Sequence, residues 1–331
     1  MPTSETFNAL VVAEINGIFE RTIETKSFSD LPSGDVVVEV VYSSLNYKDA
    51  LSASGNKGVT RHYPHTPGIN AAGIVRSSTT TTFTKGDLVI VGGYGFGTAI
   101  NGGFGQFVSV PTQCVIALPD GLSLLEAMTL GTGGFTAAQS LAKLIAFGLT
   151  PDQGPLLVTG ATGGVGSATV SIAAHLGYHV VAATGKKTAH EFLKTLGAAE
   201  VLDRSEVDLP ADRPMLKEKW AGCIDSVGGN ILTTALRATK YGCSVTTCGL
   251  TQSSDITATV FPFILRGVNL LGIDSASLPL PQRKAIWHKL ATEWKPPHLS
   301  LICTECDLSE INKYIDAILQ GKITGRIVLK H

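Results

Sequence analysis

The stretch from residue 153 to residue 185 constrains the fold of this chain most, because it contains no Asp, Glu, Lys or Arg. Within it, a short, mostly apolar run at 156–159 leads into three glycines at a spacing of three residues, Gly160, Gly163 and Gly166. An apolar stretch of helical character and then a second apolar run follow the glycines. A parallel strand buried on both faces and a helix packed against it have this composition, so the stretch predicts strand, turn, helix and strand.

The three glycines give this unit the pattern of a dinucleotide-binding turn. One glycine permits a tight turn, one lets a pyrophosphate approach the backbone, and one permits close packing of helix on strand. The helix N-terminus also presents unpaired N–H groups and the positive end of the helix dipole to a phosphate. Glycine-rich turns also occur in ordinary βαβ units, so the glycines alone are a weak signal. The apolar helix and the second strand favour the dinucleotide interpretation.

The composition of the whole chain favours a small-molecule partner. The 331 residues suggest two domains, and 26 basic against 27 acidic residues leave no charge imbalance that would attract nucleic acid or an anionic membrane surface. The uncharged segment 88–119 is long enough to span a bilayer, but its many glycines indicate turns of a globular core. We therefore expect no nucleic-acid partner and no membrane span.

The N-terminus and the cysteines predict a cytoplasmic protein. Residues 1–5 show no basic segment followed by an apolar one, so no signal peptide is visible. Six cysteines scattered through such a chain are expected to be reduced and mostly buried. Cys303 and Cys306 have the spacing of a redox or metal pair, but no second pair follows, so we expect structural thiols there.

The order of the elements predicts an α/β protein with two kinds of architecture. Short β-branched runs separated by turns fill residues 7–125 and predict a barrel-like β unit. From residue 124 onward, helical stretches alternate with strands, which predicts a doubly wound parallel sheet. A last helix and strand, at 308–319 and 325–330, could return to the first unit.

With these parts in place, the sequence resembles the medium-chain dehydrogenase/reductase superfamily. The resemblance implies a β-rich, GroES-like barrel domain for the substrate at 1–127 and 275–331, and a Rossmann domain for NADPH at 128–274. Zinc-dependent members carry a cysteine and a Gly-His-Glu where this chain has Asn46 and Gly68-Ile69-Asn70. An amide and an alkyl side chain cannot replace a thiolate and an imidazole as zinc ligands, so the resemblance implies a zinc-free reductase with no metal site.

More specific motifs are similar to those of the NADPH-dependent acrylyl-CoA reductases, formerly grouped with quinone oxidoreductases. These motifs are Ser-Ser-Leu-Asn-Tyr-Lys-Asp-Ala at 43–50, Pro-Gly-Ile at 67–69, Thr-Gly-Ala-Thr-Gly-Gly-Val-Gly-Ser at 159–167, Pro-Phe-Ile-Leu-Arg-Gly-Val at 262–268 and Leu-Gly-Ile-Asp-Ser at 271–275. Two positions depart from the family pattern: Asn70 stands where Asp is usual, and Ile100-Asn101 where His-Trp is common. Both lie in the substrate domain, so they bear on the acyl substrate and not on the cofactor.

The end of the second strand favours NADPH over NADH. A carboxylate there would bind the ribose hydroxyls of NADH and repel a 2′-phosphate. This chain has Thr184, Gly185 and Lys186 instead, which match the Ser-Gly-Arg triplet of the resembled family. Arg204, after the third strand, resembles the residue that packs over the adenosine end. The alternatives are that Lys186 begins a solvated helix and that Arg204 is a surface residue beside Asp203.

The resemblance also assigns contacts along the rest of the cofactor. In the glycine turn, the expected cofactor-binding residues are Thr162, Gly163, Gly164 and Val165. For the nicotinamide and its ribose they are Tyr47, Thr136, the backbone of Leu250 and Ile273, and Arg326. Glycines beside Leu250 and Ile273 permit a close approach of the backbone. Arg326 could instead cap the last strand without touching the cofactor.

The reaction that the resemblance implies is hydride transfer from NADPH to the β-carbon of an activated alkene, with acrylyl-CoA reduced to propionyl-CoA as the expected case. Negative charge then develops on the carbonyl oxygen, and without a metal it must be met by hydrogen-bond donors. Asn46 and Tyr47 lie where the zinc ligand would have been, so they are the expected catalytic residues. We expect Asn46 to hold the cofactor ribose or the carbonyl, and Tyr47 to touch the nicotinamide or donate. A lone tyrosine in a β domain can also be a packing residue, and Asp49 is expected to be structural.

Three hypotheses remain open at this point. The first is an NADPH-dependent enoyl-thioester reductase, the second a reductase of quinones or free enals, and the third a non-catalytic NADPH-binding sensor or structural protein. The altered Asn70 and Ile100-Asn101 positions motivate the second hypothesis. By resemblance alone, the protein is expected to be a homodimer.

Overall fold

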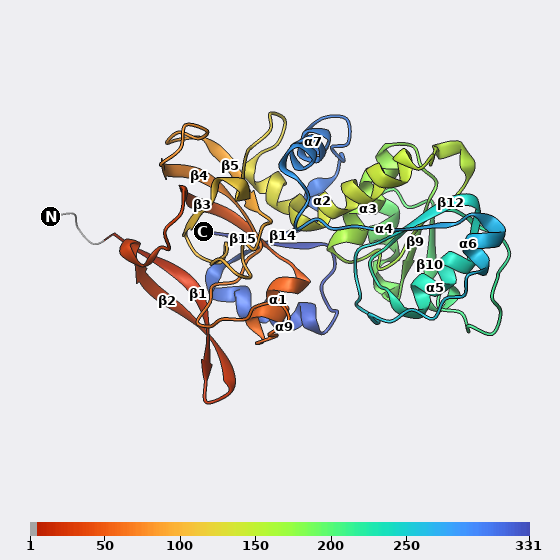
Figure 1. The fold of residues 1–331 in the computed structure, drawn as a ribbon, viewed down its shortest axis with the longest axis horizontal. Coiled ribbons are helices and arrows are strands. Elements are labelled where there is room, and N and C mark those ends of the chain that lie inside the picture. Colours follow the sequence, from red (N-terminus) through yellow and green to blue (C-terminus); the bar gives the residue numbers. More distant parts are fainter. Residues whose placement is uncertain (1–4) are drawn as a thin grey trace. The chain divides into compact units, whose positions relative to one another are not determined.

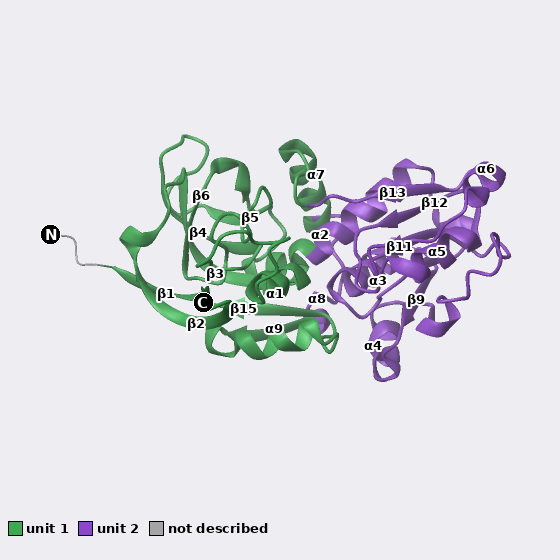
Figure 2. Ribbon diagram, turned by 60° about the horizontal axis from the view of Figure 1, so that its bottom comes forward, with its two compact units in different colours: residues 1–132, 276–291, 303–331 green, residues 133–275, 292–302 purple. Residues whose placement is uncertain are grey.

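The computed structural model describes residues 5–331 and divides the chain into two compact units (Figures 1 and 2). The first unit holds the chain up to Thr132 together with 276–291 and 303–331, and the second holds 133–275 and 292–302. The sequence placed the divisions at 127/128 and 274/275, slightly earlier in the chain, and did not assign 292–302 to the second unit. Residues 1–4, which form most of the segment inspected for a signal peptide, lie outside the described residues.

The first unit is built mainly from antiparallel strands. A separate hairpin consists of β1 (Thr6–Ile15) and β2 (Ile18–Ser27), joined at Asn16 and Gly17, both of which have positive φ. The larger sheet contains β3 (Val36–Leu45), β4 (Asn70–Ser78), β5 (Leu88–Gly92), β6 (Phe107–Val110), β7 (Val115–Ala117), β14 (Cys303–Asp307) and β15 (Arg326–Lys330). Its order is β14-β15-β3-β4-β5-β7, with β6 paired to β3. The predicted return of the last strand to this unit is therefore confirmed, since β15 pairs with β3.

Three helices belong to the first unit: α1 (Tyr47–Ala53), α7 (Leu280–Ala291) and α9 (Ile311–Leu319). One apolar cluster joins α1 and α9 to the strands, through Leu10, Leu45, Ala50, Ile315 and Ile327. Burying these side chains removes apolar area from water at about 25 cal/mol per Å². The cluster fixes the start of α1 beside the end of β3 and the start of β15.

Helix α2 (Leu124–Ala146) contributes its first part to the first unit and its second part to the second unit. The sequence predicted helical stretches from residue 124 onward. The first of them is one helix that is interrupted at Gly131, whose φ of 48° and ψ of −152° are not helical. A side chain would disfavour this φ, so glycine permits the kink.

The second unit contains a six-stranded parallel sheet, as the sequence predicted. Its strands are β8 (Leu156–Val158), β9 (Val180–Thr184), β10 (Glu200–Asp203), β11 (Trp220–Asp225), β12 (Thr239–Thr247) and β13 (Asn269–Gly272). The order β10-β9-β8-β11-β12-β13 is that of a doubly wound sheet, with the change of winding direction between β8 and β11. Helices of this unit are α3 (Gly164–His175), α4 (His190–Thr195), α5 (Gly229–Ala238), α6 (Phe261–Arg266) and α8 (Leu299–Ile302).

Candidate functional site

The glycine turn between β8 and α3 has the geometry that its spacing predicted. Gly160 has a φ of 58°, which glycine adopts without strain. A Cβ on Gly166 would lie 2.3 Å from the Gly160 carbonyl oxygen and 2.6 Å from the Ala161 Cα, so only glycine permits this packing of helix on turn. A Cβ on Gly163 would meet only the Gly160 oxygen, at 3.4 Å. The backbone at Gly163 is therefore open to a ligand, and α3 begins beside it.

The end of β9 lies next to this turn. The hydroxyls of Thr162 and Thr184 are 3.3 Å apart, and the Lys186 backbone N–H donates to Thr184 Oγ1 at 3.1 Å. A Cβ on Gly185 would lie 3.4 Å from the Arg204 guanidinium carbon, so this exposed cation covers Gly185. The structure thus brings together Thr162, Thr184, Gly185, Lys186 and Arg204, which the sequence placed at the phosphate and adenosine end of the cofactor. Burial lowers the pKa of the half-buried Lys186.

An acidic residue, Asp203, lies near this end of β9, since it is opposite Thr184 in the register of β9 and β10. Its side chain accepts from the Ser205 backbone N–H at 3.0 Å and from the Ser205 hydroxyl at 2.7 Å. These bonds lower the pKa of Asp203 and direct the carboxylate to the turn that follows. Asp203 therefore caps the turn at 204–206 with its carboxylate. The charged side chains that flank the end of β9 are instead the cations Lys186 and Arg204.

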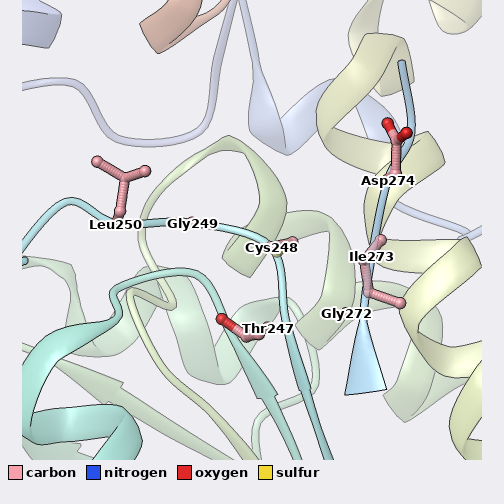
Figure 3. A pocket seen from close by; sticks show the side chains of 7 residues that line it. All are labelled: Thr247, Cys248, Gly249, Leu250, Gly272, Ile273 and Asp274. Carbon is pink, nitrogen blue, oxygen red and sulfur yellow. The ribbon is translucent and has the colours of Figure 1, made fainter. Parts of the chain in front are cut away.

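A cavity of about 440 Å³ lies at the carboxyl ends of β12 and β13 (Figure 3). It is lined by Thr247, Cys248, Gly249, Leu250, Gly272, Ile273 and Asp274. Leu250 and Ile273, assigned from sequence to the nicotinamide end, therefore share one cavity. Thr136, assigned to the same end, is a buried residue of α2 that does not line this cavity. The open backbone at Gly163, the cations beside Gly185 and this cavity fit an extended dinucleotide with phosphates.

A buried polar cluster surrounds Asn46 in the first unit. Asn46 Nδ2 donates to the Ser44 carbonyl, to Asp49 Oδ2 and to Asn70 Oδ1, each at 3.0 Å. Asn46 Oδ1 accepts from Arg326 Nη1 at 3.0 Å. The side chain is 8 % exposed, so both ends of its amide are engaged inside the unit. These contacts favour a positioning role for Asn46 over direct contact with the cofactor ribose or a substrate carbonyl.

Asp49 connects α1 to the loop before β4. Its Oδ1 accepts from the backbone N–H groups of Gly68 and Ile69 at 3.2 and 2.7 Å, and its Oδ2 accepts from the Asn46 backbone N–H at 2.8 Å. Burial raises the pKa of Asp49 to about 6, although these donors and the Arg326 charge act in the opposite direction. Asp49 thus holds the start of α1 in place, which is the structural role expected for it.

Arg326, at the start of β15, is a buried cation, and burial lowers its pKa to about 10. Besides Asn46, it donates to Ser44 Oγ at 2.9 Å and to the Thr129 carbonyl at 3.3 Å. A Cβ on Gly131 would lie 2.6 Å from Arg326 Nη2, so the kink of α2 fits against the guanidinium. These contacts support the alternative in which Arg326 has an internal structural role.

Tyr47 adjoins this cluster, and Asn70 is a member of it. Tyr47 is the first residue of α1, directly after Asn46, and 38 % of its side chain is exposed. Asn70 Oδ1 accepts from the Thr132 backbone N–H at 2.9 Å as well as from Asn46. The cluster therefore fixes the backbone just before Tyr47, a residue that is itself partly exposed. The sequence did not indicate that Ser44, Asn70 and Gly131 belong to one cluster, because they are far apart along the chain.

Neither of the two positions at which zinc-dependent members of the resembled superfamily bind zinc carries a metal-binding side chain here. Asn46 has the amide contacts given above, and Ile69 has an alkyl side chain. Among residues 5–331, no three His, Cys, Asp or Glu side chains are grouped so that they could bind a metal ion. In the same part of the chain, no helix has the length and apolar character needed to cross a membrane.

None of the six cysteines forms a disulfide, and burial raises the pKa of each thiol. Cys303 and Cys306 lie three residues apart on β14, so their side chains point to opposite faces of the strand. Cys306 is 4 % exposed and belongs to the apolar cluster of the first unit. These positions agree with the expectation of structural thiols.

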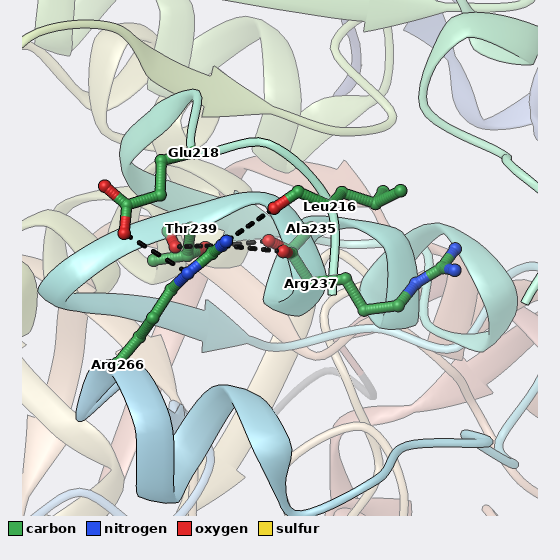
Figure 4. Close-up of polar contacts among 6 residues, drawn as sticks. All are labelled: Leu216, Glu218, Ala235, Arg237, Thr239 and Arg266. Atoms are coloured by element: carbon green, nitrogen blue, oxygen red, sulfur yellow. Dashed lines mark hydrogen bonds and ion pairs between the residues drawn. The ribbon is translucent and has the colours of Figure 1, made fainter. Parts of the chain in front are cut away.

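Arg266 explains the Phe-Ile-Leu-Arg motif. At the end of α6, its guanidinium donates to the carbonyls of Leu216 and Arg237 at 2.6 and 3.0 Å, and it pairs with Glu218 at 3.2 Å (Figure 4). It thereby ties α6 to the end of α5 and to the segment before β11. This motif, which was one basis of the resemblance, is structural.

Comparisons with known proteins cover both units. Residues 32–120 match the alcohol dehydrogenase GroES-like domain, and residues 164–292 match the zinc-binding dehydrogenase domain. The chain is 43 % identical to the acrylyl-CoA reductase AcuI of Ruegeria pomeroyi over 98 % of both chains. The yhdH oxidoreductase of Salmonella enterica in complex with NADP has a TM-score of 0.95 at 39 % identity, covering 98 % of this chain and 99 % of that one.

The Bacillus subtilis protein yhfP with NAD bound has a TM-score of 0.97 at 43 % identity, covering 99 % of this chain and 100 % of that one. These similarities extend over both units and include the parallel sheet and the β-rich unit. They confirm the fold expected from the sequence, a GroES-like domain combined with a Rossmann domain. The chain therefore belongs to the medium-chain dehydrogenase/reductase family of oxidoreductases.

Proposed function

We propose that this protein reduces an α,β-unsaturated acyl thioester with NADPH, and that acrylyl-CoA, reduced to propionyl-CoA, is its substrate. The observation that carries the cofactor assignment is the end of β9, where Lys186 and Arg204 flank Gly185 and the carboxylate of Asp203 is engaged by Ser205. The thioester assignment is supported by the similarity to the acrylyl-CoA reductase of Ruegeria pomeroyi. Bound NADPH would supply the hydride for the β-carbon.

In this proposal the second unit binds the cofactor and the first unit contacts the carbonyl group of the substrate. In the second unit, the N–H groups at the start of α3 bind the pyrophosphate, Lys186 and Arg204 bind the 2′-phosphate, and the cavity at Leu250 and Ile273 holds the nicotinamide half. In the first unit, the Tyr47 hydroxyl donates to the carbonyl oxygen on which negative charge develops. Asn46, held by Asp49 and Arg326, keeps Tyr47 in place. The α-carbon then takes up a proton from solvent or from a positioned acid.

A reductase of quinones or free enals is the second candidate function. Asn70 and Ile100-Asn101 differ from the family pattern in the substrate unit, and a relative 44 % identical over 93 % of this chain is a putative quinone oxidoreductase of Bacillus subtilis. The third candidate function is an NADPH-binding sensor without turnover.

NADPH oxidation measured side by side with acrylyl-CoA, acrolein and a benzoquinone separates the three candidate functions. We expect the highest kcat/KM with acrylyl-CoA. Equal or faster turnover of the quinone would reject the thioester assignment, and tight binding without turnover would favour the sensor.

Substituting Lys186 by glutamate is expected to weaken NADPH binding about 30-fold while changing NADH binding less than about threefold. The reason is that a carboxylate repels the 2′-phosphate, which only NADPH carries, and charge-assisted bonds to phosphate are among the strongest polar contacts. Dissociation constants from cofactor fluorescence give both values. Lys187→Glu is the matched control, because the neighbouring lysine is exposed and undergoes the same charge change. Equal losses for NADPH and NADH in Lys186→Glu would contradict the assignment.

We further propose that the protein is a homodimer formed through β13 and α6. Within the described chain, β13 is an edge strand that pairs only with β12. The Gly272 carbonyl accepts from Lys143 Nζ at 2.9 Å, and the rest of the outer edge of β13 can pair with a strand of a second copy. Beside it, α6 and its preceding residue expose apolar side chains at Val260, Phe261, Ile264 and Leu265. Exposed apolar groups of this size next to an unpaired edge are typical of an interface.

Ile264→Asp is expected to convert the dimer to a monomer, because a charge placed in an apolar interface loses its hydration. Light scattering after gel filtration measures the change in mass. Ile18→Asp is the control, since Ile18 in the β1–β2 hairpin is 64 % exposed and Ile264 is 69 % exposed. A wild-type protein that is already monomeric, or a dimer that survives Ile264→Asp, would contradict this interface.

A further inference from the structure

Asp225 is a buried carboxylate to which the proposed function assigns no role. It is the last residue of β11 and has 0 % exposed surface. Its strand pairs with β8 on one side and β12 on the other, so Asp225 lies at the centre of the sheet. The carboxyl ends of these strands form the edge at which dinucleotides bind in doubly wound sheets. A charge at this position can therefore act on a bound cofactor without touching it.

The hydrogen-bond partners of the Asp225 carboxylate all donate to it. Thr159 Oγ1 donates to Oδ1 at 2.7 Å, the Gly228 backbone N–H donates to Oδ2 at 2.9 Å, and the Thr247 hydroxyl donates to Oδ2 at 3.4 Å. The Val227 backbone N–H adds a fourth donor. None of these partners is a cation, and four donors without an acceptor suit an ionised carboxylate. Burial raises the pKa of Asp225, and the four donors act in the opposite direction, so the ionised carboxylate is stabilised by dipoles and not by a cation.

The Thr159 contact also connects Asp225 to the glycine turn. The Ser226 backbone N–H donates to Thr159 Oγ1 at 3.2 Å, which leaves the hydroxyl proton of Thr159 for Asp225. The Ser226 hydroxyl donates to the Thr159 carbonyl at 3.1 Å. Because Gly160 follows Thr159, these bonds fix the start of the turn relative to the end of β11.

Asp225 also contacts two residues of the cavity wall. Thr247 and Cys248 line the cavity, and Thr247 is itself a partner of the carboxylate. The Cys248 backbone N–H and thiol donate to the Asp225 carbonyl at 3.0 and 3.3 Å. A Cβ on Gly249 would lie 2.2 Å from the Ser226 carbonyl oxygen, so the wall packs directly on the segment that begins at Asp225.

We propose that the buried charge of Asp225 makes this cavity favour the oxidised nicotinamide over the reduced one. The proposal rests on the proposed function, which places the nicotinamide half of the cofactor in the cavity. The oxidised ring carries a positive charge and the reduced ring is neutral, whereas the phosphates are the same in both forms. A negative charge inside the protein is poorly screened, so it stabilises the two forms unequally. Such a field also assists hydride donation, because positive charge develops on the ring as the hydride leaves.

A carboxylate that lines the cavity itself, Asp274, provides a matched comparison. Asp274 lines the same cavity but is exposed, so water screens its charge. Removing the charge of Asp274 or of Asp225 changes the formal charge of the protein equally. If the relative affinity for NADP⁺ and NADPH changes more when the Asp225 charge is removed, the difference is therefore due to the burial of Asp225.

The experiment measures dissociation constants of the full chain for NADPH, by cofactor fluorescence, and for NADP⁺, by calorimetry. In Asp225→Asn, we expect the ratio of the NADP⁺ constant to the NADPH constant to rise about tenfold, and in Asp274→Asn less than about twofold. Circular dichroism establishes that each variant is folded. The 2′-phosphate contributes equally to both constants, so the ratio does not depend on Lys186 or Arg204.

An unchanged ratio in folded Asp225→Asn, including an equal loss of affinity for both forms, would overturn the proposal. If that variant does not fold, Thr247→Lys replaces it, since a cation on the half-buried cavity wall beside Asp225 opposes the same field. It is expected to raise the ratio, and an unchanged ratio in folded Thr247→Lys would overturn the proposal. A wild-type protein that binds neither NADPH nor NADP⁺ would instead reject the proposed function.

Discussion

Replacing Arg326 by methionine is expected to lower the free energy of unfolding by about 4 kcal/mol, as for other buried charges that lose their partner. The guanidinium is the cation whose field acts on the buried Asp49, and the Asn46 amide bridges the two groups. Methionine fills a similar volume but leaves Asp49 uncompensated, and it leaves acceptors at Ser44 and Thr129 without their donor. Urea denaturation followed by circular dichroism measures the loss.

A double-mutant cycle separates the charge effect from packing. Asp49→Asn removes the carboxylate, so Arg326→Met should cost about 2 kcal/mol less in the Asp49→Asn background than in the wild type. Arg326→Lys serves as the control that keeps the charge and loses the branched contacts, and it should be intermediate. Strictly additive losses in the cycle would show that the two buried charges do not interact.

The second large effect is expected for Gly166→Ala, with a loss of about 3 kcal/mol in stability and no measurable NADPH binding. The added Cβ would lie within 3 Å of three backbone atoms, the Gly160 oxygen and the Cα and carbonyl carbon of Ala161. These atoms cannot turn aside as a flexible side chain can, so the helix must separate from the turn. Thermal denaturation and cofactor fluorescence measure the two effects.

Gly163→Ala is the matched control for this substitution. Gly163 precedes the same helix, its φ of −77° is available to any residue, and its added Cβ would make only an ordinary contact at 3.4 Å. We expect its stability to change by less than about 1 kcal/mol, with weaker cofactor binding because the methyl group occupies the space open to the pyrophosphate. Equal destabilisation by the two alanines would mean that helix packing is not what requires Gly166.

The features that the sequence predicted well are those encoded within one short stretch. The parallel sheet and the glycine turn follow from an uncharged run and its glycines, and the end of β9 follows from three adjacent residues. The cluster around Asn46 could not be predicted in this way, because Arg326 is 280 residues away from Asn46 and joins it only through the pairing of β15 with β3. The same limit applies to Asp225, whose donors come from the ends of three strands.

The elements that the sequence analysis missed are short or exposed. Strand β2 is polar and largely exposed, so its only local signal is the Asn16-Gly17 turn, which is a strong hairpin sequence. Helix α6 comprises six residues and exposes most of its apolar side chains, so its periodicity resembles that of a loop. Helix α1 begins inside a motif that was interpreted for its chemistry and not for its structure.

The burial of the six cysteines bears on how this protein would tolerate the electrophilic substrates of the proposed function. Enals and unsaturated thioesters are electrophiles that alkylate cysteine, and the thiolate is the form that reacts. Burial raises the pKa of Cys114 to about 11 and that of Cys248 and Cys306 to about 12, and it raises the pKa of the other three thiols as well. At neutral pH almost no thiolate is present, even at Cys248 on the cavity wall. Within the described chain, this protein thus contains no thiol whose pKa is lowered so that it would add readily to such an alkene.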